Sequence, residues 1–392
     1  MSLPQTRKMF KIALLLLLFS IVLGGCWDRT EINDLAFVMG TAIDKEKDGY
    51  RVSVIIPLPG NMGGPSGGEG SGKRPFTIQS ATGSTHREAL DKMQRKLSRR
   101  LFLAHRRVLL LGEDLMGEDL SILLDSTVRS TESRLTTLIG FTKGKASDLL
   151  GSDVKLERFA IEAAREILKS EATIFLSLKK VFSDLYEEGI DALIPYLETI
   201  DSHVSNEKTK EINPAGYVLT RNGRGVGILT GDHANALHFL KKEFNRTRQI
   251  LRTENASFSI VVDNTMTEIK PYLEGDEVHF DVRVTAEGHL VEEVSPTRMT
   301  YKSRQELKEL WSRKLESDLN QLLEILKSYK SDVVGFGKIL QNRYPEKWKS
   351  QWGSNWSEHF AKSSFHVSVK TNIDRFGTLG ENLNREGSFH DD

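Results

Sequence analysis

The sequence has one cysteine, Cys26, in 392 residues. A single cysteine cannot form an internal disulfide, so an exported form of this chain must be stabilised by packing alone. Neither sign of charge is in excess, because Lys and Arg together number 54 and Asp and Glu together also number 54. We therefore expect no nucleic-acid partner, since such binding usually requires a marked basic excess. Beyond residue 23 the chain also lacks any apolar segment long enough to cross a membrane.

The N-terminal segment has the layout of an export signal. Arg7, Lys8 and Lys11 provide a positive region around the start of an apolar run over residues 12–23. At about 1.5 Å per residue, this run is too short as a helix for a hydrocarbon core of roughly 30 Å. It therefore suits the apolar region of a signal peptide better than a membrane-spanning helix. We predict a lipoprotein-type signal peptide over residues 1–25.

The last residues of this segment, Leu23-Gly24-Gly25-Cys26, resemble a bacterial lipobox. In such a site a diacylglyceryl group is attached to the cysteine sulfur, and cleavage leaves Cys26 as the new N-terminus, where an N-acyl group can follow. Two or three acyl chains give stable attachment, because each buried CH₂ contributes only about 0.8 kcal/mol. The short apolar run disfavours an uncleaved anchor, which is one alternative. The absence of an Ala-x-Ala site near Gly25 disfavours ordinary cleavage elsewhere, which is the other.

Two enzyme motifs occur in a stretch over residues 59–75 that is rich in Gly, Pro and Ser and is typical of a flexible surface loop. Residues 67–73 fit the opening of a phosphate-binding loop, but Arg74 stands where the magnesium-binding Ser or Thr belongs. Residues 64–68 fit G-x-S-x-G, but a nucleophile elbow requires a strand before it and a helix after it. We interpret both matches as parts of a linker.

The histidines give no catalytic or metal-binding pattern either. His105 lies at the start of an apolar strand, where a hydrogen-bonded structural histidine is more common than a catalyst. Other histidines are scattered, and no HExxH pair occurs; they include His86, His203, His233, His238 and His279. We therefore expect no enzyme activity, no metal and no cofactor.

Hydrophobic periodicity predicts an α+β fold class, with antiparallel sheets packed against helices in a mixed α/β chain. Asn222-Gly223 between two apolar runs is a strong hairpin signal. The longest predicted helix covers residues 304–329, and its apolar stripe suits packing on a sheet. Thr85 and Glu88 form a capping box at the start of a helix predicted over residues 84–101. Further helices are predicted over residues 118–130, 145–150, 156–170, 177–188, 232–244 and 336–341, and strands over residues 36–43, 50–58, 76–80, 107–112, 135–142, 215–220, 225–229, 258–262, 266–273, 278–286, 289–294 and 365–373.

The length of the chain predicts two or three domains. A polar run after Pro195 gives the best boundary, and we place a linker at residues 201–213. This linker separates an N-terminal α/β domain over residues 26–200 from a C-terminal α+β domain over residues 214–376. The polar residues 377–392 are predicted to form a loose tail.

A long signature follows the cysteine. Residues 26–36 read Cys-Trp-Asp-Arg-Thr-Glu-Ile-Asn-Asp-Leu-Ala, with Gly40 and Ile43-Asp44-Lys45 behind them. This pattern is similar to the N-terminal signature of the Ger(x)C family, the C subunits of nutrient germinant receptors in spore-forming bacteria. Later parts of the same family resemble residues 100–113, 214–229 and 332–336, the tryptophans Trp348, Trp352 and Trp356, and Phe360.

The resemblance implies a lipid-anchored, non-enzymatic subunit of a receptor complex required for spore germination, with the family's own fold. It implies partners that are the receptor's A subunit and its membrane-embedded B subunit. The implied location is the outer face of the cytoplasmic membrane, which is the spore inner membrane. Trp27, Asp28, Arg29, Asn33 and Asp34 lie beside the lipidated cysteine, so they are candidates for contact with membrane or partner. Structural capping of the first strand is an equal alternative for these five residues.

A solute-binding lipoprotein of a transporter is the alternative function. Such proteins normally have two α/β lobes with mainly parallel sheets around a cleft, and the hairpin-rich second half of this chain disagrees with that layout. A lipid-anchored hydrolase, the third hypothesis, would need a triad or a metal site that the sequence does not supply.

Overall fold

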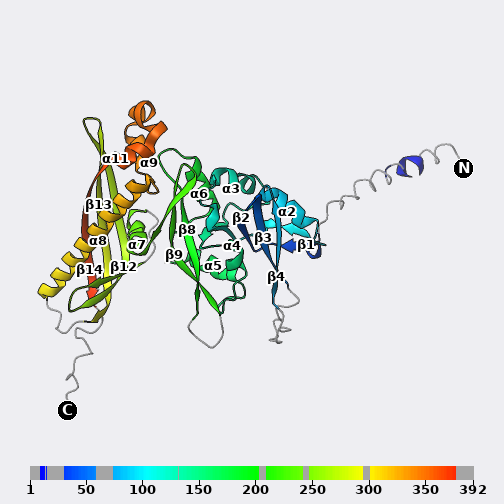
Figure 1. Cartoon of the computed structure of the whole chain (residues 1–392), viewed down its shortest axis with the longest axis horizontal. Coiled ribbons are helices and arrows are strands. Elements are labelled where there is room, and N and C mark those ends of the chain that lie inside the picture. Colours follow the sequence, from blue (N-terminus) through cyan, green and yellow to red (C-terminus); the bar gives the residue numbers. More distant parts are fainter. Residues whose placement is uncertain are drawn as a thin grey trace, which may run out of the picture.

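The computed structural model describes residues 9–13, 15, 31–58, 74–130, 132–202, 209–241, 247–294 and 301–376. Cys26, most of the glycine-rich stretch over residues 59–75 and the predicted tail over residues 377–392 lie outside these ranges. Helices pack on three sheets in the described part, so the predicted α+β class is confirmed (Figure 1). No helix in the described ranges is long and apolar enough to cross a membrane.

Eight strands form the largest sheet, in the order β10-β9-β8-β7-β6-β2-β3-β4. The four adjacent strands β8, β7, β6 and β2 run parallel, whereas both ends of the sheet are built from antiparallel pairs. The strands are β2 (Gly40–Glu46), β3 (Gly49–Pro57), β4 (Phe76–Gly83), β6 (Val108–Gly112), β7 (Leu138–Thr142), β8 (Leu193–Asp201), β9 (Lys210–Arg221) and β10 (Arg224–Thr230).

Helices cover both faces of this sheet because its central strands are apolar on both sides. All five residues of β6 are buried. On one face, Leu109 and Leu111 pack in the same cluster as α3 (Leu120–Arg129) and α6 (Leu178–Tyr186). On the other face, Val108 and Leu110 pack with α4 (Ala146–Leu150) and α5 (Ala160–Lys169).

The predicted helix over residues 84–101 begins as expected. The helix α2 covers His86–Gln94, and its first turn is capped because Thr85 Oγ1 accepts the Glu88 N–H at 3.1 Å. The capping box is altered in one respect, because the Glu88 carboxylate accepts the N–H of Ser84 at 2.7 Å. The local sequence therefore predicts the start of this helix correctly.

The same helix ends earlier than predicted. Gln94 accepts the Leu101 N–H through its side-chain oxygen at 2.7 Å and donates to the Arg99 carbonyl at 3.0 Å. These two bonds hold the chain in a return turn after α2. Leu101 is buried in β5 (Arg100–Phe102), which pairs in parallel with β1 (Leu35–Phe37) as a separate two-stranded sheet.

A second body is built on a four-stranded sheet, in the order β11-β12-β13-β14. Its strands are β11 (Thr247–Arg252), β12 (Ser257–Glu274), β13 (Glu277–Val294) and β14 (Ser364–Phe376). The four short strands predicted between residues 258 and 294 are two strands of 18 residues each, because β-bulges let the pairing continue through the interruptions. β11 was not predicted, since Thr-Arg-Gln-Ile-Leu-Arg has only two apolar residues.

The long helix α8 (Tyr301–Tyr329) lies along this sheet (Figure 1). Its predicted apolar stripe is buried and consists of Leu307, Trp311, Leu315, Leu319, Leu322 and Leu326. The aromatic stripe farther along the chain is also core, with Trp348, Trp352, Trp356 and Phe360 all buried. These aromatics follow α9 (Phe336–Arg343) and α10 (Pro345–Lys347) through π and 3-10 turns into α11 (Trp356–Lys362).

Both described ends of the predicted linker over residues 201–213 reach the eight-stranded sheet, because Asp201 is the last residue of β8. Residues 210–213 belong to β9, which pairs with β8 from the predicted N-terminal domain. A single cluster of buried side chains also runs from Ile43 in β2 through Leu237 in α7 (Gly231–Leu240) to Ile373 in β14. The two predicted domains therefore share both a sheet and a core, in an elongated molecule with β1 toward one end and β14 toward the other (Figure 1).

The connection between α8 and α9 joins these two halves. Asp332 is fully buried there, and its backbone exchanges two hydrogen bonds of 2.9 Å with Asp191, which lies two residues before the start of β8. Its carboxylate oxygens accept four further bonds of 2.7 to 3.0 Å, from the N–H groups of Gly335, Phe336 and Gly337 and from Trp356 Nε1. Burial raises the pKa of Asp332, and burial raises the pKa of Asp191 to about 7.

Candidate functional site

The predicted signature residues are only partly within the described chain. Trp27, Asp28 and Arg29 lie outside it together with Cys26. Asn33 and Asp34 are exposed in a 3-10 turn, Ile32–Asp34, directly before β1. This position is compatible with contact to a membrane or to a partner, so that role stays a prediction.

An aromatic cluster connects this first strand to the body of the protein. Phe37 of β1 packs edge-on against Phe102 of β5, with ring centroids 5.5 Å apart. The exposed His105 contacts both rings, at 5.2 Å from Phe37 and 5.5 Å from Phe102. His105 is therefore packed on the sheet formed by β1 and β5, and it also lines a pocket.

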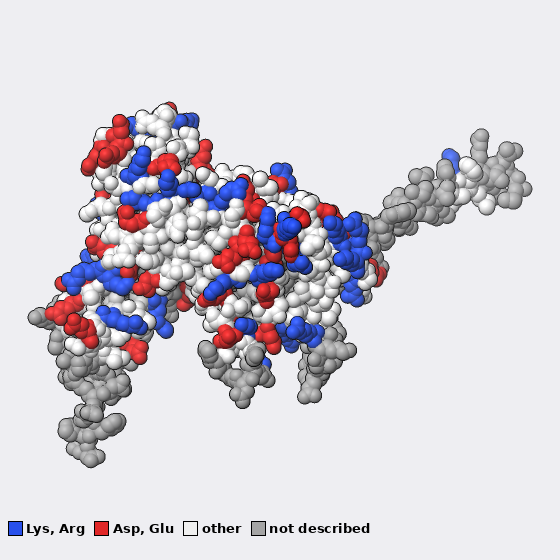
Figure 2. Space-filling model, in the orientation of Figure 1, with Lys and Arg blue, Asp and Glu red and all other residues white. Residues whose placement is uncertain are grey.

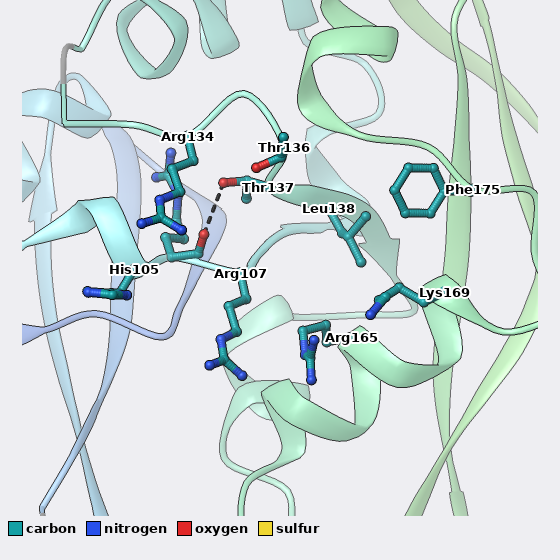
Figure 3. A pocket seen from close by; sticks show the side chains of 10 residues that line it. His105, Arg107, Arg134, Thr136, Thr137, Leu138, Arg165, Lys169 and Phe175 are labelled. Atoms are coloured by element: carbon teal, nitrogen blue, oxygen red, sulfur yellow. Dashed lines mark hydrogen bonds between the residues drawn. The ribbon is translucent and has the colours of Figure 1, made fainter.

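This pocket, which we call the basic pocket, has a volume of about 570 Å³ (Figure 3). It lies where the parallel strands β6 and β7 begin, because Val108 pairs with Leu138 and the Leu138 N–H donates to the Arg107 carbonyl at 2.9 Å. The helix α5 borders it on one side. The lining residues are His105, Arg106, Arg107, Arg134, Thr136, Thr137, Leu138, Arg165, Lys169 and Phe175.

Five cationic side chains line the basic pocket, and one carboxylate holds two of them in place. Glu162 in α5 accepts hydrogen bonds of 2.9 Å from both Arg107 and Arg165. Arg165 also pairs with Glu166. Figure 3 shows Arg107, Arg165 and Lys169 along one side of the pocket.

The remaining three cations have no carboxylate partner within the described ranges. Arg134 and Lys169 are exposed at the rim, whereas Arg106 is only 3% exposed. Arg106 donates through its terminal nitrogen to Ser133 Oγ at 3.1 Å, but its buried Nε has no partner among the described residues. Burial lowers the pKa of Arg106 to about 10, so it stays charged at neutral pH.

The charge of Arg106 also acts on a neighbouring buried residue. The pKa of His86 is lowered to about 4, chiefly by its burial and further by the charge of Arg106. The His86 ring is held by hydroxyls of α3, from Ser126 at 2.8 Å and Thr127 at 3.2 Å. His86 is therefore a neutral structural residue near neutral pH.

The basic pocket was not predicted from the sequence. Its cations come from three stretches about 30 residues apart, and only the parallel pairing of β6 with β7 and the packing of α5 bring them together. The pair Arg106-Arg107 directly before the fully buried strand β6 was the one local signal. Both enzyme-like motifs, at residues 64–68 and 67–73, lie outside the described ranges. Among the described residues, no group of three His, Cys, Asp or Glu side chains could hold a metal ion.

Two family models together match most of the chain. A model described as the spore germination protein N-terminal domain matches residues 28–199, and a model described as spore germination B3/GerAC like, C-terminal, matches residues 215–377. The chain is 32% identical to the putative spore germination protein YfkR of Bacillus subtilis (strain 168), over 84% of this chain and 87% of that protein. It is 27% identical to the spore germination protein KC of the same strain, over 97% of this chain and 98% of that protein.

The fold matches a solved structure as well. The crystal structure of the GerBC protein aligns with a TM-score of 0.57 at 19% identity, covering 88% of this chain and 100% of that chain. At this identity the match shows a shared fold. The sequence matches and the fold lead to the same conclusion, and the chain belongs to the Ger(x)C family of spore germination proteins.

Proposed function

We propose that this protein is a lipid-anchored, non-enzymatic subunit of a nutrient germinant receptor on the outer face of the spore's cytoplasmic membrane. The observation that carries the proposal is the position of Cys26. The family match begins at residue 28, so the lipobox cysteine directly precedes the folded chain. An acylated Cys26 would tether the folded body to the bilayer surface, where the proposed A and B subunits would be present at a high effective concentration.

The distribution of cations supports a defined orientation at that surface. Arg95, Lys96, Arg99 and Arg100 are exposed between α2 and the start of β5. Figure 2 shows Lys and Arg side chains gathered at the end of the molecule that carries β1 and α2 in Figure 1. Each cation close to an anionic membrane surface contributes about 1 kcal/mol of attraction. The end nearest the proposed anchor is thus suited to anionic lipid.

The anchor is tested with protein from its native spores. We expect intact mass spectrometry to show that the protein begins at Cys26 and carries two or three acyl chains. A Cys26→Ser variant should leave the membrane fraction, while a Ser66→Ala variant, which keeps the lipobox, should remain in it. An unmodified sulfur in the parent protein, or equal fractionation of the parent and Cys26→Ser, would contradict the anchor.

The receptor assignment has a separate test. A tagged parent protein should co-purify with an A subunit and a B subunit from spore membranes. Spores without this protein should fail to respond to one class of nutrient and still germinate by a trigger that bypasses nutrient receptors. Recovery of the tagged protein without either subunit, under conditions that keep other receptor complexes intact, would contradict the assignment.

The solute-binding alternative has no specific observation in its favour. A second lobe with a parallel sheet would be expected for it. The second body instead contains two antiparallel pairings, β11 with β12 and β12 with β13, and a single parallel one.

A further inference from the structure

We infer that the basic pocket binds a ligand that carries phosphate, with Arg106, Arg134 and Lys169 as its charge partners. This ligand would be either the headgroup of an anionic lipid or a soluble phosphate compound. The inference adds a binding site to the proposed receptor subunit and does not depend on the lipid at Cys26.

The balance of charges in the basic pocket is the first argument. The five lining cations face two carboxylates, Glu162 and Glu166, and both are already paired with Arg107 or Arg165. The pocket therefore keeps an excess of about three positive charges in a chain whose formal net charge is zero. Like charges gathered in a concave site repel one another, and a ligand with more than one negative charge relieves that repulsion.

The burial of Arg106 is the second argument. A guanidinium that is 3% exposed loses most of its hydration, and its Nε–H has no acceptor among the described residues. A buried donor without an acceptor is destabilising, and a charged one more so. Nε itself is sealed from the pocket, so a phosphate there would offset the charge of the Arg106 guanidinium and would not bond to Nε.

The shape of the site selects a small ligand over a protein segment. A volume of about 570 Å³ lies within the usual range for small-molecule pockets, and the two strand ends and α5 border it. Guanidinium groups match the oxygens of phosphate in pairs, and the exposed Thr136 adds a hydroxyl donor at the rim. An acidic peptide would instead need an extended groove, so we favour a phosphate group on a compact ligand.

The test uses calorimetry on the full chain, purified in micelles of an uncharged detergent. One titration uses inorganic pyrophosphate, and a second uses dihexanoyl phosphatidylglycerol below its own micelle concentration. The variant Arg134→Gln/Lys169→Gln removes two unpaired cations from the rim, where folding is least affected. The matched control Arg313→Gln/Lys349→Gln removes one Arg and one Lys that are also exposed and that lie outside both the basic pocket and the cationic end near α2.

We expect saturable binding of at least one of these two ligands. The rim variant should weaken it by roughly tenfold for each charge-assisted hydrogen bond lost, and the control should leave it unchanged. The variant Glu162→Gln should tighten binding several-fold, because it frees Arg107 and Arg165 from their carboxylate. A response to pyrophosphate alone assigns a soluble ligand, and a response to the lipid alone assigns a headgroup.

Other results would overturn the inference. Binding of neither ligand would do so, as would binding that the rim variant and the control weaken equally, because the site would then be a diffuse surface attraction. A third titration with a polyglutamate peptide completes the test. Saturable binding of that peptide without a response to either phosphate compound would exclude the phosphate assignment.

Discussion

The buried carboxylate of Asp332 offers the sharpest test of how the two halves of this protein are held together. Its oxygens accept four hydrogen bonds, from three backbone N–H groups at the start of α9 and from Trp356. The variant Asp332→Ala leaves these four donors without an acceptor in the protein interior. At about 1 kcal/mol for each stranded donor, the lower bound of the usual range, the free energy of unfolding should fall by at least about 4 kcal/mol.

A graded series makes the reasoning quantitative. Asp332→Asn keeps one oxygen and replaces the other with an amide donor, so two donors are stranded whichever way the amide points, and the loss should be about 2 kcal/mol. Trp356→Phe removes one donor and should cost about 1 kcal/mol for the hydrogen bond. In the double variant Asp332→Ala/Trp356→Phe one of the four stranded donors is gone, so its loss should be smaller than the sum of the losses of Asp332→Ala and Trp356→Phe.

The assay is urea unfolding followed by tryptophan fluorescence, with the free energy extrapolated to water. Asp276→Ala, at the exposed turn between β12 and β13, is the control and should stay within about 0.5 kcal/mol of the parent. A loss below about 1 kcal/mol for Asp332→Ala would refute the reasoning. Strict additivity of Asp332→Ala and Trp356→Phe would show that the two groups do not share the bond of 2.8 Å.

Three further outcomes follow from buried groups. Burial lowers the pKa of His238 to about 4, below the value of about 6.5 expected in the unfolded chain. Its contribution to the free energy of unfolding is therefore complete above pH 6.5 and is lost as the pH falls toward 4. Denaturation at several pH values should show that His238→Gln reduces this acid-induced loss of stability by up to about 3 kcal/mol. Burial raises the pKa of Asp191 to about 7, so its contribution to the free energy of unfolding is complete below about pH 4 and is lost as the pH rises through 7. The stability of Asp191→Asn relative to the parent should therefore increase between pH 5 and pH 8. A difference in stability that stays constant with pH would contradict this. In Gly40→Ala the new Cβ would lie 2.2 Å from Ile161 Cγ1, so thermal unfolding should show a loss of about 1–3 kcal/mol in the free energy of unfolding. The control Gly151→Ala, whose new Cβ has no contact closer than 3.5 Å, should lose less.

Short-range features of the fold were predictable because their chemistry is local. The turn at Asn222-Gly223 has φ values of 49° and 76°, the left-handed pair that a two-residue hairpin requires. The stripe of α8 and the first turn of α2 depend on spacing within a few residues, and both agree with the structure. The assignment to the Ger(x)C family was likewise predicted from the residues after Cys26 and is confirmed.

Features that depend on distant residues were missed or misjudged. The end of α2 is determined by Gln94 bonding to a returning chain, which no pattern within the helix reveals. The division at residues 201–213 followed the polar composition, and the two family models divide the chain at the same stretch, but the pairing of β8 with β9 across it was not predicted. The basic pocket needs β6, β7 and α5 to be placed in space, so its cations read as ordinary surface charges in the sequence.

The unbroken buried cluster from Ile43 to Ile373 has a mechanical consequence. Close-packed interiors transmit strain with little compression, so we expect the eight-stranded and four-stranded sheets to resist bending about the core that they share. We therefore expect a force on one of these two sheets to change the orientation of both together.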